Sequence, residues 1–215
     1  MIIMYRYLLF DLDGTLTESG EGIMNAAAYA FKAMGRTVPD EDRLRAFVGP
    51  SLKESFSLYD MNEKQIDEAI RQFRVYFADR GWCENRPYPG IPELCEKLCG
   101  RGYTMMVATS KLESQAVRIV KHFGLEPFFE ATVGSDDITR SGKADVVRYV
   151  LNKYDISPSE AVMIGDRFYD VKGAAACGLK TIGVAYGYGT RQELLDAGAL
   201  TVADTVNELG RILGV

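Results

Sequence analysis

The chain has little of what builds the common disulfide, zinc and membrane-spanning proteins. Its 215 residues include one histidine, four cysteines, seven prolines and one tryptophan. So few histidine and cysteine ligands argue against an ordinary zinc site, and the four cysteines predict free thiols in a reduced, cytoplasmic protein. No apolar run approaches the length of about 20 residues that crosses a bilayer, so no membrane is expected as a partner.

An excess of positive charge is also missing. The 25 lysine and arginine side chains are outnumbered by 30 aspartates and glutamates, which gives a net charge of −5. Proteins that bind nucleic acid usually carry a basic patch, and none is evident, so a nucleic acid polymer is not expected as a partner.

The length suits one large domain, or one domain with a small insertion.

Short apolar runs alternate with helical patterns along most of the chain. The runs are Tyr7–Phe10, Met105–Ala108, Ala161–Ile164 and Thr181–Val184, and the helical stretches include Glu113–His122 and Lys143–Tyr154. Because the runs are apolar at nearly every position, each is expected to be a strand buried on both faces. This alternation predicts an α/β fold, a doubly wound parallel sheet with a Rossmann-like core made of residues 1–16 and 84–215.

Residues 17–83 follow a different pattern, which is helical and polar. About four helices are expected there, over Asn25–Met34, Asp40–Phe47, Leu52–Tyr59 and Glu63–Arg80. These helices could simply pack on the sheet. Their continuous span favours a separate small α-helical domain that is inserted after the first strand.

Polar side chains gather where the predicted strands end. Asp11 and Asp13 follow the first apolar run, Thr109 and Ser110 follow the second, and Asp166 follows the third. Open parallel sheets bind their ligands at the carboxyl ends of the strands. These residues are therefore expected to meet at one edge of the sheet.

The aspartates predict a site for Mg²⁺. Asp11 and Asp13 are two residues apart, so both can face one site, and close carboxylates repel unless a cation or proton lies between them. Mg²⁺ prefers oxygen ligands, and Asp11, Asp13 and Asp166 would supply them. Asp170 lies four residues after Asp166 and is either a further ligand or an outer carboxylate. The alternative for each pair is an ordinary turn or the start of a helix.

Thr109, Ser110 and Lys143 predict a site for an anion. Hydroxyl and backbone N–H groups at the start of a helix bind phosphate, although the same residues also serve as ordinary helix caps. Lys143 opens a predicted helix and brings a compact positive charge. A phosphate that meets these residues would lie beside the aspartates.

The ordered set of motifs resembles a known family. Asp11-Leu12-Asp13-Gly14-Thr15, Thr109, Lys143 and Gly165-Asp166…Asp170 are similar to the four motifs of the haloacid dehalogenase-like hydrolase superfamily. Tyr88-Pro89-Gly90-Ile91 and Ala108-Thr109-Ser110-Lys111 resemble its phosphoglycolate phosphatase-like and 5′-nucleotidase-like branch. The inserted helices resemble the C1-type cap of that superfamily. Ala144 departs from the pattern, because that branch often has proline there.

The resemblance implies a phosphatase that acts on a small-molecule phosphate ester. Asp11 would be the nucleophile and Asp13 the general acid and base. Mg²⁺ would be held by Asp11, Asp166 and the backbone carbonyl of Asp13. The remaining implied roles are phosphate binding by Thr109, Ser110 and Lys143, and substrate contacts in the cap by Glu18, Ser19, Glu21, Gly49 and Ser51.

Two other functions stay open on the same scaffold. A phosphomutase similar to β-phosphoglucomutase shares the catalytic residues and the cap type, and a non-catalytic binding protein would keep the fold alone. The dehalogenase branch lacks a carboxylate at the position of Asp13, so its presence favours phosphoryl transfer. Both a monomer and a homodimer are compatible with the sequence.

Overall fold

The computed structural model describes residues 5–136 and 138–215. The chain divides into two compact units, one formed by Met1–Thr17 and Pro87–Val215 and the other by Glu18–Arg86. The sequence analysis placed the corresponding boundaries at residues 17 and 83.

The larger unit is built on a six-stranded parallel sheet with the strand order β3-β2-β1-β4-β5-β6. Its strands are β1 (Tyr7–Phe10), β2 (Thr104–Leu112), β3 (Ala131–Ser135), β4 (Ala161–Gly165), β5 (Lys180–Val184) and β6 (Thr201–Ala203). β1 lies between β2 and β4, with Phe10 opposite both Val107 and Ile164. This topology confirms the predicted doubly wound α/β fold.

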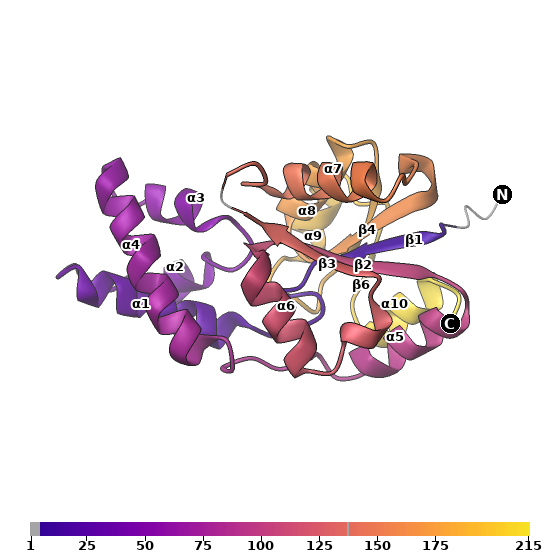
Figure 1. The fold of residues 1–215 in the computed structure, drawn as a ribbon, viewed down its shortest axis with the longest axis horizontal. Helices are drawn as coiled ribbons and strands as arrows, with labels where there is room; N and C mark the ends of the chain where they lie inside the picture. Colours follow the sequence, from indigo (N-terminus) through magenta and orange to yellow (C-terminus); the bar gives the residue numbers. More distant parts are fainter. Residues whose placement is uncertain (1–4, 137) are drawn as a thin grey trace. The chain divides into compact units, whose positions relative to one another are not determined.

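Helices cover both faces of this sheet (Figure 1). One face carries α7 (Lys143–Lys153), α8 (Phe168–Ala175) and α9 (Arg191–Asp196), and the other carries α5 (Ile91–Gly100), α6 (Glu113–His122) and α10 (Val206–Ile212). Short 3₁₀ turns η2 (Glu126–Phe128) and η3 (Pro158–Glu160) precede β3 and β4.

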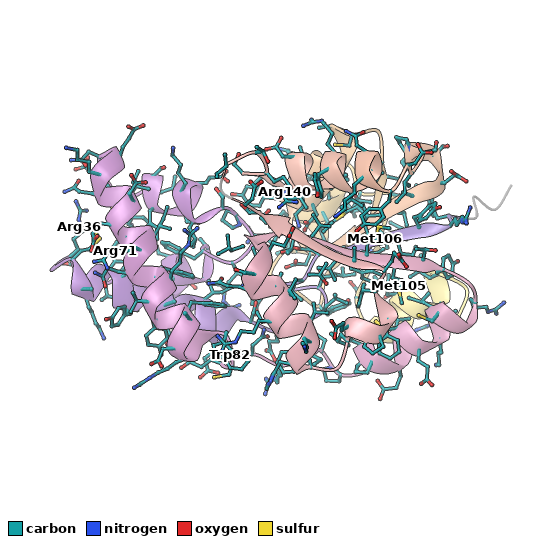
Figure 2. All side chains as sticks on the ribbon, viewed as in Figure 1. Arg36, Arg71, Trp82, Met105, Met106 and Arg140 are labelled. Carbon is teal, nitrogen blue, oxygen red and sulfur yellow. The ribbon has the colours of Figure 1, made fainter. Side chains whose placement is uncertain are left out.

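The strands are buried on both faces because their side chains alternate between the two helical layers. Leu9 and Met106 belong to the core cluster that contains Val146 and Val150 of α7. Met105, the neighbour of Met106 on β2, is equally buried, and Figure 2 labels both residues on the sheet. An apolar residue is therefore needed at every central strand position, which is the pattern that the sequence displays.

Two strands were missed, and a third is longer than predicted. β3 and β6 are the edge strands of the sheet, and β6 has only three residues. β2 continues to Leu112, which pairs with Ser135 after a shift in register that begins at Ala108. Thr109 and Ser110 therefore lie within a strand, and the prediction that they begin a helix is wrong, because α6 starts only at Glu113.

The smaller unit contains α1 (Gly20–Ala33), α2 (Glu41–Arg45), α3 (Leu52–Ser57), α4 (Glu63–Tyr76) and the π-helix η1 (Phe77–Gly81). α1 begins earlier than the predicted Asn25, and α4 gives way to the π-helix before Arg80. Phe31, Phe47, Phe56 and Tyr59 form an aromatic cluster with ring centroids 4.8 to 6.2 Å apart. This cluster gives the unit a core of its own.

Two further expectations from the sequence concern free thiols and membrane-spanning helices. All four cysteines are free thiols, of which Cys95 is buried while Cys83 and Cys99 are exposed. Among the described residues, no helix combines the length and the apolar character needed to cross a membrane.

Candidate active site

Asp11 lies at the carboxyl end of the central strand. Its backbone N–H donates to the carbonyl oxygen of Ile164 at 2.9 Å, which continues the β1–β4 ladder by one residue. The residue is only 3% exposed. A carboxylate in such a place needs a cation nearby, because burial without a partner strongly disfavours its charge.

Lys143 is that cation. Its Nζ atom lies 2.7 Å from Asp11 Oδ1 and 2.8 Å from Asp170 Oδ1, and it donates to the carbonyl oxygen of Ala108 at 3.0 Å. The aliphatic part of the side chain crosses α8 at Gly173, where a Cβ atom would lie 2.7 Å from Lys143 Cγ. The side chain of Lys143, the first residue of α7, thus passes along α8 and reaches the carboxyl end of the sheet.

The loop before Lys143 is fastened by Arg140, which Figure 2 labels. The Arg140 guanidinium lies 3.2 Å from a Glu113 carboxylate oxygen and 3.5 Å from an Asp136 oxygen, and it covers the Tyr149 ring at 4.3 Å. These contacts join the residues that follow β2 and β3 to the middle of α7, the helix that Lys143 begins.

Asp166 is fully buried at the end of β4 and is held at both oxygens. The hydroxyl of Thr15 donates to Asp166 Oδ1 at 3.3 Å, and the backbone N–H of Tyr188 donates to Oδ2 at 2.8 Å. The Tyr186 hydroxyl in turn donates to the Thr15 carbonyl at 3.0 Å. The glycine-rich segment after β5, residues 186–189, therefore packs directly against Asp166, which was predicted from the sequence to be a metal ligand.

Gly187 in this segment has no room for a side chain. A Cβ atom there would clash with the carbonyl oxygen of Gly14 and would lie 2.5 Å from Asp166 Cβ. A glycine is needed because the backbone comes within contact distance of both motif loops. The aspartates of these loops were predicted from the sequence, but this contact was not.

Asp170 lies in the first turn of α8 and is 1% exposed. Its Oδ2 atom accepts from the backbone N–H of Arg167 at 3.0 Å, while Oδ1 faces Lys143. One oxygen thus caps the helix and the other pairs with the lysine. This arrangement favours the outer-carboxylate interpretation of Asp170.

Asp11, Asp166 and Asp170 each present one carboxylate oxygen, and these atoms lie within 4.8 Å of one another. Burial raises the pKa of Asp11 to about 6, although Lys143 opposes the change, and burial with the neighbouring Asp170 and Asp11 raises the pKa of Asp166 well above its usual value. Burial lowers the pKa of Lys143, but Asp11 and Asp170 outweigh it and raise the pKa overall. Lys143 contacts two of these three buried carboxylates, Asp11 and Asp170, and the clustered oxygens fit a hard divalent cation such as Mg²⁺.

Asp13 is turned to another partner. Lys111 Nζ lies 2.8 Å from Asp13 Oδ2 and 3.1 Å from Oδ1, and both side chains are nearly buried. Thr109 lies next to this pair, and its Oγ1 accepts from the backbone N–H of Lys111 at 3.2 Å. The Asp13 side chain is not among the three carboxylates described above.

The predicted substrate contacts of the cap all lie in the smaller unit. Glu18 pairs with Arg86 at 2.6 Å, and Ser51 caps α3 by accepting from the backbone N–H of Glu54 at 3.3 Å. Ser19 and Glu21 lie at the start of α1, and Gly49 has a φ of 110° in the turn before α3. Their contacts with a substrate stay a prediction.

A family model described as haloacid dehalogenase-like hydrolase matches residues 8–184. The chain belongs to this family. The match includes the ends of β1 and β4 and the starts of α7 and α8, from which the buried carboxylates and Lys143 come.

Relatives of this haloacid dehalogenase-like hydrolase carry both phosphatase and kinase names. A 5′-nucleotidase of Pseudomonas aeruginosa is 42% identical over 194 residues, which are 89% of this chain and 88% of that protein. A predicted phosphatase from Clostridium acetobutylicum has a crystal structure that is 43% identical, with a TM-score of 0.93 and 97% of each chain covered. The tyrosine-protein kinase PtkA of Mycobacterium tuberculosis is 41% identical over 98% of this chain and 73% of its own. Family and phosphatase relatives together confirm the predicted enzyme class, a hydrolase of the phosphatase type.

Two features of the hydrolase escaped the sequence analysis. Lys111 appeared there only as part of a resemblance, yet it pairs with a carboxylate 98 positions away. Tyr188 was not among the predicted site residues, yet its backbone N–H donates to Asp166. Nothing in the local sequence of either residue signals a partner so distant along the chain.

Proposed function

We propose that this chain is a Mg²⁺-dependent phosphatase that hydrolyses small phosphate monoesters through an aspartyl-phosphate on Asp11. The observation that carries the proposal is the buried group of Asp11, Lys143, Asp166 and Asp170 at the end of the parallel sheet. Asp13 stands two residues from Asp11 as a second carboxylate. Such a pair suits a nucleophile with a separate acid and base.

The oxygen donors and the raised pKa values of Asp11 and Asp166 support a magnesium ion. Asp11, Asp166 and the backbone carbonyl of Asp13 would hold it. When bound, Mg²⁺ neutralises charge on the phosphoryl oxygens and on the carboxylates. Asp170 would support the site by holding Lys143.

The reaction would take two steps. In the first, an oxygen of Asp11 forms a bond to phosphorus, the ester P–O bond breaks, and the leaving oxygen takes a proton from Asp13. In the second, water attacks phosphorus, Asp13 takes its proton, and the bond to Asp11 breaks. Lys143, Thr109 and the Ser110 backbone would bind the transferring phosphoryl group.

The helical unit would act as the cap and choose the substrate. Glu18, Ser19, Glu21, Gly49 and Ser51 remain the proposed contacts. Nucleoside 5′-monophosphates are the first class to test, supported by the Pseudomonas relative, and phosphoglycolate is the second. The free thiols are consistent with a reducing compartment such as the cytoplasm.

The test is phosphate release from a panel of esters with Mg²⁺ or with EDTA. The panel contains nucleoside 5′-monophosphates, phosphoglycolate, sugar phosphates and p-nitrophenyl phosphate. We expect release that requires the metal and is concentrated on one class. Absence of release from every ester would contradict the proposal, and a sugar phosphate isomerised only with a bisphosphate would indicate a mutase. Folded protein that is inactive in both assays would indicate a binding function.

A further inference from the structure

Lys111 has no assigned role in the proposed function, yet it makes the main described contact of Asp13. Its Nζ atom reaches both carboxylate oxygens, at 2.8 and 3.1 Å. The side chains of Lys111 and Asp13 are 6% and 10% exposed. Solvent therefore screens this pair much less than a surface ion pair.

An irregularity in the backbone of β2 around Lys111 directs this side chain toward Asp13. The register of β2 against β3 shifts between Ala108 and Leu112, and such irregularities near active sites change the direction of a side chain. Thr109 Oγ1 accepts from the Lys111 backbone N–H, which fixes the shifted segment. Burying a lysine also costs side-chain entropy, so the fold alone gives little reason to place it here.

We propose that Lys111 is the positioning residue of Asp13, which it holds in the orientation that transfers a proton to the leaving oxygen and later accepts one from water. This inference rests on the proposed phosphatase function. Because Lys111 contacts both oxygens, it keeps one contact when the other oxygen carries the transferable proton. Lys111 itself forms no bond with substrate in this account and acts only through Asp13.

The alternative is a purely structural pair that neutralises a buried charge. A structural loss would lower the activity on every ester alike. A loss of positioning would depend on the leaving group, because p-nitrophenolate departs without a proton whereas an alkoxide requires one. The two roles therefore differ in a measurable way.

The experiment compares the first turnover of two esters in full-length Lys111→Met. We expect release of the alcohol from the best alkyl phosphate to fall about 10- to 100-fold, part of the effect of a general acid. Release of p-nitrophenolate in the first turnover should stay close to wild type. Later turnovers should slow, giving a burst, because hydrolysis of the aspartyl-phosphate also needs Asp13.

Three further variants make the comparison specific. Lys111→Arg keeps the charge and should restore much of the alkyl ester rate. In an Asp13→Asn background, Lys111→Met should cause no additional loss, and this double variant also removes the unpaired buried charge if the single variant folds poorly. Lys121→Met changes an exposed lysine of α6 and should behave as wild type.

Equal losses with both esters, or additive losses with Asp13→Asn, would overturn the role of Lys111 and leave the phosphatase proposal intact. Wild-type protein that releases phosphate from no ester would instead overturn the proposed function and this inference with it. Circular dichroism and urea unfolding of each variant show whether a loss comes from the fold.

Discussion

At the scale of single residues, the candidate site is a group of buried charges that depend on one another. Lys143 lies between Asp11 and Asp170, and Asp166 is held by two hydrogen-bond donors. Removing one member of a buried charged group leaves the others without compensation, which costs more than a surface ion pair contributes.

Lys143→Met should therefore damage both stability and activity. Asp11 and Asp170 would lose their shared cation, so we expect a loss of about 3–5 kcal/mol in the free energy of unfolding. Phosphate release should fall by at least about 100-fold, as when a donor to transition-state charge is removed. Urea unfolding and phosphate assays measure the two effects. Lys97→Met, at an exposed position of α5, is the matched control, and an unchanged Lys143→Met enzyme would contradict the account.

The two adjacent carboxylates should be separable by trapping the intermediate. Asp13→Asn should slow hydrolysis of the aspartyl-phosphate more than its formation from p-nitrophenyl phosphate. Formation needs no acid, because p-nitrophenolate departs without a proton, whereas hydrolysis needs Asp13 to take a proton from the attacking water. Acid-quenched protein should then carry a phosphoryl group on the peptide that contains Asp11. Mass spectrometry detects it. Asp11→Asn should show no adduct and no turnover, and an adduct at another residue would remove Asp11 as the nucleophile.

At the scale of elements, the strands that the sequence predicted are those buried on both faces. β1 and β4 carry no charged residue, β5 has one only at its exposed first position, and all three begin and end within a residue of the predicted runs. β3 and β6 are at the edges, where a strand is covered less and can be short, so they lack that signal. The end of β2 carries Thr109, Ser110 and Lys111, and these polar residues resemble a loop even though they lie within the strand, between Ala108 and Leu112, which pair with β3.

Gly187→Ala tests whether the glycine-rich segment after β5 supports the proposed metal site. The added methyl group would meet Gly14 and Asp166, so the segment must move and the hydrogen bond from Tyr188 to Asp166 should weaken. We expect weaker Mg²⁺ activation by about 10- to 100-fold, as for partners of metal ligands generally. Titration of activity with Mg²⁺ measures it. Gly100→Ala, which meets nothing within 4 Å, is the control.

At the scale of the whole molecule, the sequence predicts which residues lie close together at the end of the sheet. It does not predict which side chains contact one another there. The ends of parallel strands fall at one edge, so the meeting of Asp11, Asp166 and Lys143 follows from topology. The pairing of Asp13 with Lys111 depends on a register shift and on side-chain orientations. Those are set by packing across the whole sheet, which no local pattern encodes.

Clustering buried carboxylates also affects the stability of the fold. Without a metal ion, burial raises the pKa of Asp11 from 3.8 to about 6. The folded state then holds a proton that the unfolded chain has already released, so this group makes stability fall as pH rises from about 4 to about 6. Other carboxylates have the opposite effect, such as Glu68, whose pKa is lowered to about 2 by its hydrogen bond from Arg71 (labelled in Figure 2).

Comparing Asp11→Asn with wild type isolates the contribution of Asp11, because the other groups are common to both proteins. In EDTA, the variant should gain stability relative to wild type between pH 4 and pH 7.5, by up to about 3 kcal/mol at about 1.4 kcal/mol per pKa unit. Mg²⁺ at pH 7.5 should stabilise wild type more than the variant, because Asp11 is a proposed ligand. Urea unfolding at both pH values, with and without the metal, measures these differences. A difference that stays constant with pH and is unmoved by Mg²⁺ would mean that Asp11 is neither strained by burial nor a ligand.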